Sequence, residues 1–210
     1  DFGVVNGKRG KGLVRWKKSG AVTISLEWNY FDESNLLPIS LLIGLTRPQT
    51  CRKIIEQAST LGVNEIHFFG TEKGEPSYAK SSLWQDEWRR LLIKGAEQAF
   101  SCRIPICEKH ESLETAFSNK SMMMKEKIAL DIYEATNCLS HFKNTHLNAG
   151  ICLAIGSERG WSNNELSLLR KKGFSLFHLG DRILRVETAM VAAVGLLAGP
   201  YWSRTEGDGL

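Results

Sequence analysis

The sequence has no apolar run long enough to cross a bilayer. Its longest apolar stretches, Ile151–Ile155 and Ala189–Leu197, fall well short of the roughly 18 to 20 residues that a membrane helix needs. No basic and then apolar leader stands at its start, which is Asp1 rather than Met. We therefore expect a cytoplasmic protein with no membrane partner.

The sequence also has few cysteines, and their spacing is uninformative. The five are odd in number and scattered, with no C-x-x-C pair and no histidine at zinc spacing: Cys51, Cys102, Cys107, Cys138 and Cys152. This excludes a disulfide framework and predicts reduced, mostly buried thiols. The histidines show no cluster in the sequence either: His67, His110, His141, His146 and His178. We accordingly expect no metal.

Several catalytic motifs are missing. Gly156-x-x-x-Gly160 is not a dinucleotide fingerprint, and Gly3–Arg9 is one residue short of a phosphate loop and lacks its Ser or Thr. There is no G-x-S-x-G and no H-E-x-x-H. These absences disfavour NAD enzymes, nucleoside triphosphatases, and hydrolases that use a triad or a metal.

What is present is the composition of a globular protein, with 42% hydrophobic and 24% charged residues and a net charge of +4. The positive charge is concentrated in the first 20 residues, which hold six Lys or Arg against Asp1 alone. Interleaved with Trp16, this cluster suits contact with the phosphates and bases of a nucleic acid. A solvated strand face remains an equally good interpretation.

The amino-terminal segment has the alternation of a β-hairpin, with strands over Gly12–Trp16 and Val22–Trp28. A lone hairpin is marginal in water, so it must pair with further strands or lie on the next domain. The polar stretch Asp32–Pro38 reads as a linker.

From Leu41 onward strands alternate with helices, which predicts an α/β layer. A helix that contains Cys51, Ile54 and Ala58 should end at Gly62, and a long helix should carry Trp84 and Trp88 as core residues. The stretch Ser118–Met124 reads as loop or short helix. The strands predicted here are Leu41–Leu45, Val63–Phe69 and Ile128–Tyr133.

The carboxy-terminal third predicts two successive strand, loop and helix units. The apolar run Ile151–Ile155 leads into the loop Gly156–Trp161, and Ser162 with Glu165 forms a capping box for a helix ending at Gly173. A strand over Phe174–Leu179 leads into the loop Gly180–Arg185, and the last helix is marked by Val186, Met190, Ala193 and Leu197. Both loops should lie at carboxyl ends of neighbouring strands, where open α/β sheets bind ligands.

The loop carboxylates Glu158 and Glu187 form an acid/base pair only if the fold brings them together. The alternative is that each carboxylate satisfies backbone donors at a loop or helix start, and we favour it.

The string Leu179–Ala189, LGDRILRVETA, closely resembles the signature L-G-x-R-I-L-R-x-E-T-A of the bacterial 16S ribosomal RNA uridine-N3 methyltransferases, the RsmE family of the SPOUT superfamily. Ile155–Ser162 resembles the family's I-G-P-E-G-G-F-S loop. Glu97, Gln98, Arg103 and Pro105 resemble its E-Q-x-x-x-x-R-x-P stretch. The similarity covers roughly residues 41–202, and the basic hairpin resembles the second half of the family's PUA-like barrel, whose first half is not seen.

This resemblance implies an α/β fold: a SPOUT-type trefoil-knotted methyltransferase domain over residues 39–210, preceded over residues 1–38 by a partial PUA-like β-barrel that binds RNA. It implies a homodimer formed through the knotted region, S-adenosylmethionine as the cofactor, and 16S rRNA or the small ribosomal subunit as partner. The cofactor-binding residues that it implies are Tyr133, Ile155, Gly156, Glu158, Gly160, Leu179, Gly180, Ile183, Leu184 and Arg185.

The implied reaction is an in-line displacement in which uracil N3 attacks the methyl carbon of the cofactor. Arg185 and Arg182 are the catalytic candidates, Arg185 for charge stabilisation and Arg182 for a phosphate or base-edge contact. Glu187 would hold an arginine or the fold. Structural bracing through carboxylates and carbonyls remains the alternative for both arginines. The RNA-binding candidates are Lys8, Arg9, Lys11 and Arg103.

The sequence departs from the family pattern at several positions. Ser157 and Arg159 replace the proline and a glycine of its loop, and Thr50, Gln57 and Ser101 stand where basic residues are common. A SPOUT fold that binds RNA without turnover, or that acts on another RNA, therefore remains an alternative.

Overall fold

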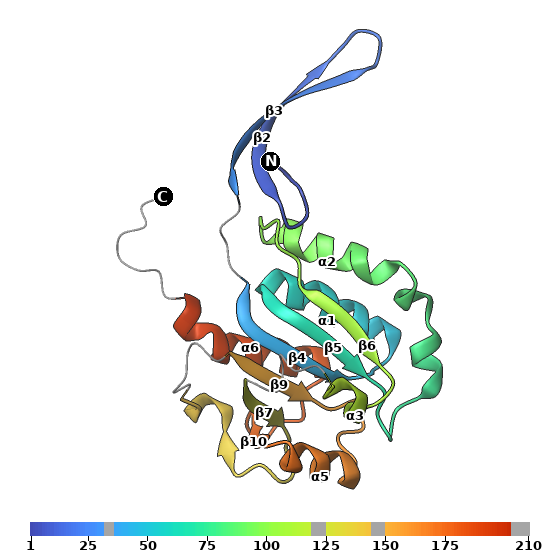
Figure 1. The fold of residues 1–210 in the computed structure, drawn as a ribbon, viewed down its shortest axis with the longest axis vertical. Helices are drawn as coiled ribbons and strands as arrows, with labels where there is room; N and C mark the ends of the chain where they lie inside the picture. Colours follow the sequence, from blue (N-terminus) through green and yellow to red (C-terminus); the bar gives the residue numbers. More distant parts are fainter. Residues whose placement is uncertain (32–35, 119–124, 144–149, 203–210) are drawn as a thin grey trace.

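In the computed structural model, which describes residues 1–31, 36–118, 125–143 and 150–202, a seven-stranded sheet forms the body of the protein (Figure 1). All of its strand pairs are parallel, in the order β6-β5-β4-β9-β7-β10-β8. A separate antiparallel sheet, β1-β2-β3, extends away from this body.

The elements alternate along the chain as an α/β protein requires. The strands are β1 Phe2–Gly3, β2 Lys8–Trp16, β3 Val22–Phe31, β4 Leu37–Gly44, β5 Val63–Phe69, β6 Ile106–His110, β7 Glu126–Leu130, β8 Asn137–Cys138, β9 Ile151–Ile155 and β10 Ser175–His178. The α-helices are α1 Pro48–Leu61, α2 Glu87–Gln98, α3 Leu113–Ala116, α5 Asn163–Lys171 and α6 Val186–Trp202. The described residues also form the 3₁₀ turns η1 Pro76–Lys80, η2 Ser82–Trp84 and η3 Leu139–His141.

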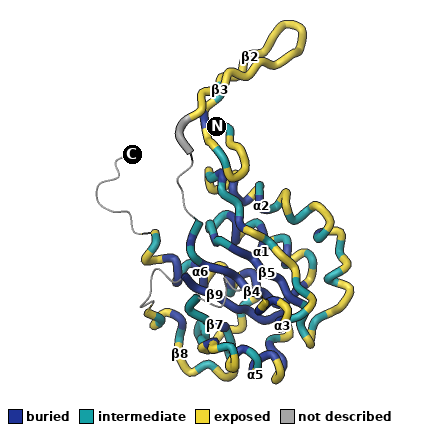
Figure 2. Tube along the Cα trace, in the orientation of Figure 1, coloured by how far each residue is buried: buried dark blue, intermediate teal, exposed yellow. Residues whose placement is uncertain are grey.

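The central strands are buried on both faces, as the continuous apolar run of β9 predicts. Alternate residues of β9 point to opposite sides, so that Leu153 packs with α1 and α6 while Ala154 packs with α3 and α5. In Figure 2 the strands β4, β5 and β9 form the buried centre of the molecule. The helices thus cover the sheet from two sides and leave its strand ends for a site.

The predicted helix ends are confirmed in two places. Gly62 caps α1 with a left-handed φ of 77°, which costs a residue without a Cβ little. Ser162 and Glu165 form the predicted capping box at the start of α5.

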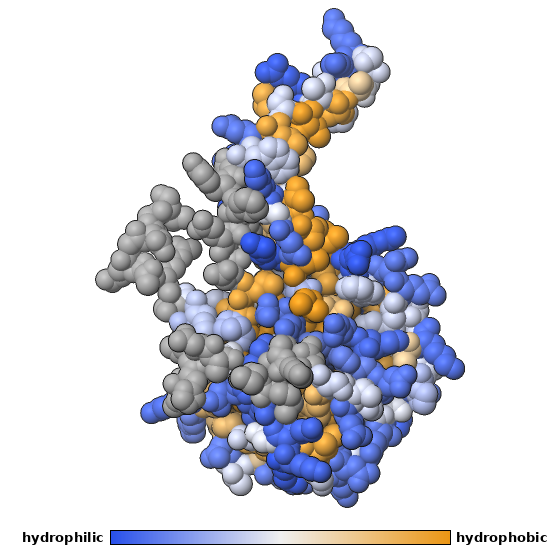
Figure 3. All heavy atoms as spheres, viewed as in Figure 1, coloured by the Kyte–Doolittle hydropathy of each residue, from blue (hydrophilic) through white to orange (hydrophobic). Residues whose placement is uncertain are grey.

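The β2–β3 hairpin is confirmed and pairs with the short β1. Its base contacts the body, where Asn6 N–H donates to Cys102 O at 2.7 Å and the Arg9 guanidinium donates to Phe100 O at 2.7 Å. Much of its apolar surface is exposed, and Figure 3 shows hydrophobic residues along it. The exposed apolar side chains are Leu13, Val14, Trp16, Val22, Ile24, Leu26 and Trp28.

The linker prediction is wrong at its carboxyl end, because Leu37 and Pro38 belong to β4. Leu37 pairs with Val63, and the register with β5 shifts before Ser40. This irregularity accommodates a proline, which has no N–H to donate to a neighbouring strand. Residues 32–35 lie outside the described part of the chain.

Two further predictions need correction. Trp84 belongs to η2 rather than to the long helix, which begins at Glu87, although Trp84 and Trp88 both pack against the core as predicted. The strand predicted to end at Tyr133 ends at Leu130, because the Asp131 carboxylate accepts hydrogen bonds from the backbone N–H groups of Tyr133 and Glu134 and turns the chain. Most of the predicted Ser118–Met124 loop lies outside the described residues.

None of the five cysteines forms a disulfide bond, and three of them, Cys51, Cys102 and Cys152, are buried, as predicted. Within the described ranges, no helix combines the length and apolar character that a membrane span requires.

Candidate functional site

A cleft of about 790 Å³ lies at the carboxyl ends of the sheet strands. Its walls come from the segments that follow β4, β7, β9 and β10 and from the first turns of α1 and α6. Because these strands are neighbours and parallel, the segments that leave them meet at one edge of the sheet. The volume is in the usual range for a small-molecule site.

The two loops predicted from the sequence meet in this cleft. The strands before them, β9 and β10, are not neighbours as predicted, because β7 lies between them. All ten residues that the family resemblance implies for the cofactor line it: Tyr133, Ile155, Gly156, Glu158, Gly160, Leu179, Gly180, Ile183, Leu184 and Arg185. Arg182 lines it too. The structure thus brings together residues of two motifs whose first residues, Ile155 and Leu179, are 24 positions apart in the sequence.

The loop after β9 is fixed by its last residue, Trp161. The indole N–H donates to Leu130 O at 2.8 Å, and the ring stacks on Phe69 with centroids 6.0 Å apart. The loop itself is a tight turn, since Gly160 N–H donates to Ser157 O at 2.9 Å. These contacts preorganise one wall of the cleft.

The segment after β5 holds this loop from outside. The Lys73 ammonium donates to Trp161 O at 2.5 Å, and Glu72 N–H donates to a Glu165 carboxylate oxygen at 3.1 Å. The Arg159 guanidinium reaches Lys73 O at 3.4 Å. The arginine that replaces a family glycine thus contacts the neighbouring segment.

The loop after β10 contains the two catalytic candidates. Gly180 has φ 100°, a conformation that side-chain-bearing residues rarely adopt, and its N–H donates to His178 Nδ1 at 3.0 Å. Arg182 and Arg185 are exposed. Among the described residues neither guanidinium has a hydrogen-bond or ion-pair partner, so the bracing alternative finds no support there.

The two carboxylates of the hypothetical acid/base pair have separate partners. Glu158 Oε1 accepts from Arg47 N–H, at the start of α1, at 3.2 Å. The buried Glu187 forms an ion pair with Lys53 of α1, with Nζ and Oε1 3.2 Å apart. Both contacts favour the structural interpretation. Glu187 joins the start of α6 to a lysine of α1, rather than to an arginine.

The sequence motifs do not indicate the α1 side of the cleft. Arg47, Gln49, Thr50 and Lys53 line it together with Asp131 of the β7 end. Their position in the sequence is the one signal for them: they follow predicted parallel strands, whose carboxyl ends meet at the same edge of the sheet.

The RNA-binding candidates lie elsewhere. Lys8, Arg9 and Lys11 are exposed on β2, and Arg103 follows α2 near the hairpin base. Since β3 leads to the amino end of β4, this region and the cleft lie toward opposite ends of the sheet strands (Figure 1).

A polar cofactor fits the cleft. Ser157 Oγ is buried in its lining and has no hydrogen-bond partner among the described residues. A buried hydroxyl without a partner costs free energy that a polar ligand can recover. The apolar side chains of Ile155, Leu179 and Leu184 line the same cleft, so it can accept both a polar and an apolar part.

The expectation that the histidines form no cluster is wrong. His67 Nδ1 and His110 Nε2 are 3.0 Å apart, with Glu108 beside them. The pairing of β5 with β6 brings them together across 43 positions of sequence.

The fold and the cleft define the class of protein. The RNA methyltransferase domain family matches residues 32–198, which include every strand of the parallel sheet and both motif loops. The chain is therefore an RNA methyltransferase family member.

The particular family follows from its relatives. The chain is 33% identical over 210 residues to ribosomal RNA small subunit methyltransferase E of Treponema pallidum, covering 96% of this chain and 78% of the relative. It is 26% identical to ribosomal RNA small subunit methyltransferase E 1 of Borreliella burgdorferi, covering 77% and 67%. The chain belongs to the ribosomal RNA small subunit methyltransferase E family, as its sequence predicts.

Solved structures agree with this fold. A ribosomal RNA small subunit methyltransferase E from Neisseria gonorrhoeae, bound to S-adenosyl methionine, aligns with a TM-score of 0.75 and 22% identity over 92% of this chain and 79% of that chain. A putative methyltransferase from Legionella pneumophila, in complex with the same cofactor, aligns with a TM-score of 0.73 and 21% identity over 93% and 80%.

Proposed function

We propose that this chain transfers a methyl group from S-adenosylmethionine to N3 of a uridine in 16S ribosomal RNA, in the cytoplasm. The observation that carries the proposal is the convergence of the two family loops, Ile155–Trp161 and Leu179–Arg185, in one cleft of cofactor size. Membership in the family supplies the substrate class.

Backbone groups of the two loops and Ser157 Oγ would hold the cofactor, with Tyr133, Ile183 and Leu184 as side-chain walls. Gly180 lets the second loop adopt a φ of 100°, which residues with a Cβ rarely do. No protein atom lies within 4 Å of the position that its Cβ would occupy, so the space beside it is open. When bound, S-adenosylmethionine supplies an electrophilic methyl group on a sulfonium centre.

The chain's own residues prepare the uridine. Arg185 stabilises the negative charge that develops on the base as N3 loses its proton. Arg182 orients the RNA through a phosphate or a base edge. Glu187, paired with Lys53, fixes the start of α6, from which Arg185 extends into the cleft.

The amino-terminal sheet β1-β2-β3 serves as a partial PUA-like RNA-binding segment. The catalytic domain begins with β4 at Leu37, two residues before the predicted boundary between residues 1–38 and 39–210. Exposed Lys8, Arg9 and Lys11 contact RNA phosphates, joined by Arg103. The separation of these residues from the cleft means that the bound RNA must extend over more than the target nucleotide.

The last strands and helix form a trefoil knot, through which two copies associate. The sheet order β9-β7-β10, followed by the return of α6 to α1, supports the knot. Exposed Val191 and Leu196 on α6 support an apolar dimer contact.

Calorimetric titration with S-adenosylmethionine tests the cofactor site. We expect one-site binding that is weakened at least tenfold by Gly180→Val, because valine is strained at φ 100°. Gly20→Val is the matched control: Gly20 has φ 81° and open space around it, but lies in the hairpin turn. Equal binding by both variants would remove Gly180 from the site.

The reaction itself is tested with unmethylated small ribosomal subunits and labelled cofactor, followed by nucleoside mass spectrometry. The expected product is N3-methyluridine. Cofactor binding without any methylated nucleoside would favour a non-catalytic RNA-binding role, and methylation of a different base would assign another substrate.

A further inference from the structure

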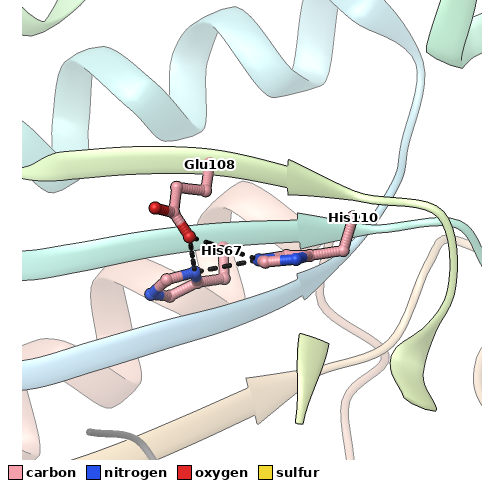
Figure 4. Close-up of side chains that lie close together, drawn as sticks. All are labelled: His67, Glu108 and His110. Carbon is pink, nitrogen blue, oxygen red and sulfur yellow. Dashed lines mark hydrogen bonds and ion pairs between the residues drawn. The ribbon is translucent and has the colours of Figure 1, made fainter. Parts of the chain in front are cut away.

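A second group of reactive side chains lies at the β5–β6 edge of the sheet, outside the cleft. His67 of β5 is the register partner of Glu108 of β6, and His110 follows two residues later on β6. Residues two apart in a strand share a face, so the three side chains point to the same side of the sheet. Figure 4 shows them converging.

The separations of their ligand atoms are those of a coordination shell. His67 Nδ1 is 3.0 Å from His110 Nε2 and 3.4 Å from Glu108 Oε2. His110 Nε2 is 3.7 Å from the same Glu108 oxygen. Ligand atoms arranged tetrahedrally at about 2.0–2.2 Å from a metal are about 3.3–3.6 Å from one another. The three separations in this cluster, 3.0, 3.4 and 3.7 Å, bracket these values.

A second layer of contacts orients His67. Its other ring nitrogen, Nε2, lies 3.4 Å from Glu65 Oε2, and Glu65 also accepts a hydrogen bond from Ser40 Oγ at 2.5 Å. His67 and Glu65 are both buried. A proton on Nε2 directs the Nδ1 lone pair at Glu108 and His110, which is the carboxylate–histidine arrangement that supports metal ligands.

Without a cation, the hydrogen bond between His67 Nδ1 and His110 Nε2, 3.0 Å apart, uses only two of the three atoms that face one point. A proton on His110 Nε2 can bridge to only one of the other two atoms at a time. A divalent cation at that point is attracted by all three. Imidazole nitrogens together with a carboxylate oxygen favour a transition metal over magnesium or calcium, which prefer oxygen ligands.

We propose that His67, Glu108 and His110 bind a divalent transition-metal ion of the zinc class, joining the edge strand β6 to β5. The His67 side chain is fully buried, whereas the Glu108 side chain is 49% exposed, so a fourth ligand position opens toward solvent on the Glu108 side. None of the three residues lines the cleft. The site is therefore separate from methyl transfer.

The test is metal binding by the untagged protein after treatment with a chelator. We expect Zn²⁺ to bind with one-to-one stoichiometry in calorimetry. Co²⁺ should give the visible bands of nitrogen and oxygen ligation without the charge-transfer band of a thiolate. His110→Gln and Glu108→Gln should each weaken binding by at least about 100-fold, more than a typical loss of a second-layer contact.

His141→Gln is the matched control, since His141 is an exposed histidine outside the cluster, and it should bind as the parent does. Folding of each variant is checked by circular dichroism, and Zn²⁺ should raise the unfolding midpoint of the parent but not of His110→Gln. The proposal is overturned by absence of saturable binding, by thiolate bands, or by unchanged affinity in both cluster variants. These readouts do not depend on methyl transfer.

Discussion

Arg185 shows how one residue can be tested against the proposed mechanism. It is the last residue before α6, is exposed, and lines the cleft. Its neighbour Glu187 is already paired with Lys53, so the guanidinium of Arg185 is available to a substrate.

For Arg185→Ala we expect the rate of methyl transfer to fall by about 100-fold or more. This is the usual effect of removing one preorganised hydrogen-bond donor that stabilises the negative charge developing in a transition state. Cofactor affinity measured by calorimetry should change little, because the loop backbone stays in place. Arg90→Ala on α2, an exposed arginine outside the cleft, is the control. An unchanged rate of methyl transfer in single-turnover assays would remove Arg185 from the mechanism.

The cysteines differ in reactivity because their environments move their pKa values in opposite directions. Burial raises the pKa of Cys107 and Cys152 to about 12, whereas the hydrogen bond from Ser140 Oγ at 3.1 Å lowers the pKa of Cys138. A lower pKa leaves more thiolate, the reactive form, at a given pH.

Brief treatment with iodoacetamide near neutral pH should therefore modify Cys138 first. Cys152 should react only after the protein is unfolded, when burial no longer suppresses its thiolate. Peptide mass spectrometry over time measures both rates. Equal rates for Cys138 and Cys152 in the folded protein would contradict the assignment.

The histidine cluster shows what reading single residues along the sequence misses. His67 and His110 have no motif spacing, and β6 carries a mixed polar pattern with no clear periodicity. Only the pairing of β6 beside β5, with His67 opposite Glu108, places the ring nitrogens next to each other.

At the scale of elements, the strand, loop and helix units of the last third are predicted well. β9 and α5 appear where the apolar run and the capping box indicate, because both signals are local to a few residues. The predicted start of α2 is too early. Trp84 fits the apolar spacing of this helix in the sequence, but in the structure it belongs to a separate 3₁₀ turn. Element starts depend on contacts with the rest of the fold, such as the edge contact of Trp84 with Phe68.

The β2–β3 hairpin makes a second element-scale prediction. Reversing the charge of Lys8, Arg9 and Lys11 to Glu should weaken RNA binding and flatten its salt dependence, because each lost phosphate contact lowers the logarithmic slope by roughly 0.7–0.9. Binding to small-subunit RNA is measured over a series of salt concentrations.

The control for this triple variant carries the same charge change on other exposed residues, Lys80, Arg89 and Arg90. It should keep the parent's slope. If both triple variants show the parent's slope, the amino-terminal cluster is a solvated strand face.

At the scale of the whole molecule, α6 connects the cleft to the proposed dimer contact. Its first turn lines the cleft, and one side of the helix packs on α1 and the sheet. The helix also exposes Val191 and Leu196, with 37% and 48% of their surface accessible. Apolar side chains in this position suit burial against a second copy.

Leu196→Glu should convert a dimer into monomers, because it places a charge in the apolar contact without an ionic partner. Light scattering coupled to size-exclusion chromatography measures the mass. Leu13→Glu, at an exposed leucine of the hairpin, should leave the dimer intact. A monomeric parent protein at micromolar concentration would contradict the proposed assembly.

The sequence by itself determined the family, the alternating α/β pattern and the two loops of the cleft, because motif strings, apolar periodicity and helix caps are short-range signals. The tertiary structure decided which strands are neighbours. It placed β4 between β5 and β9, turned Arg47 and Lys53 toward the motif loops, and brought His67 to Glu108 and His110. Strand pairing depends on packing between residues far apart in the chain, which no local pattern specifies.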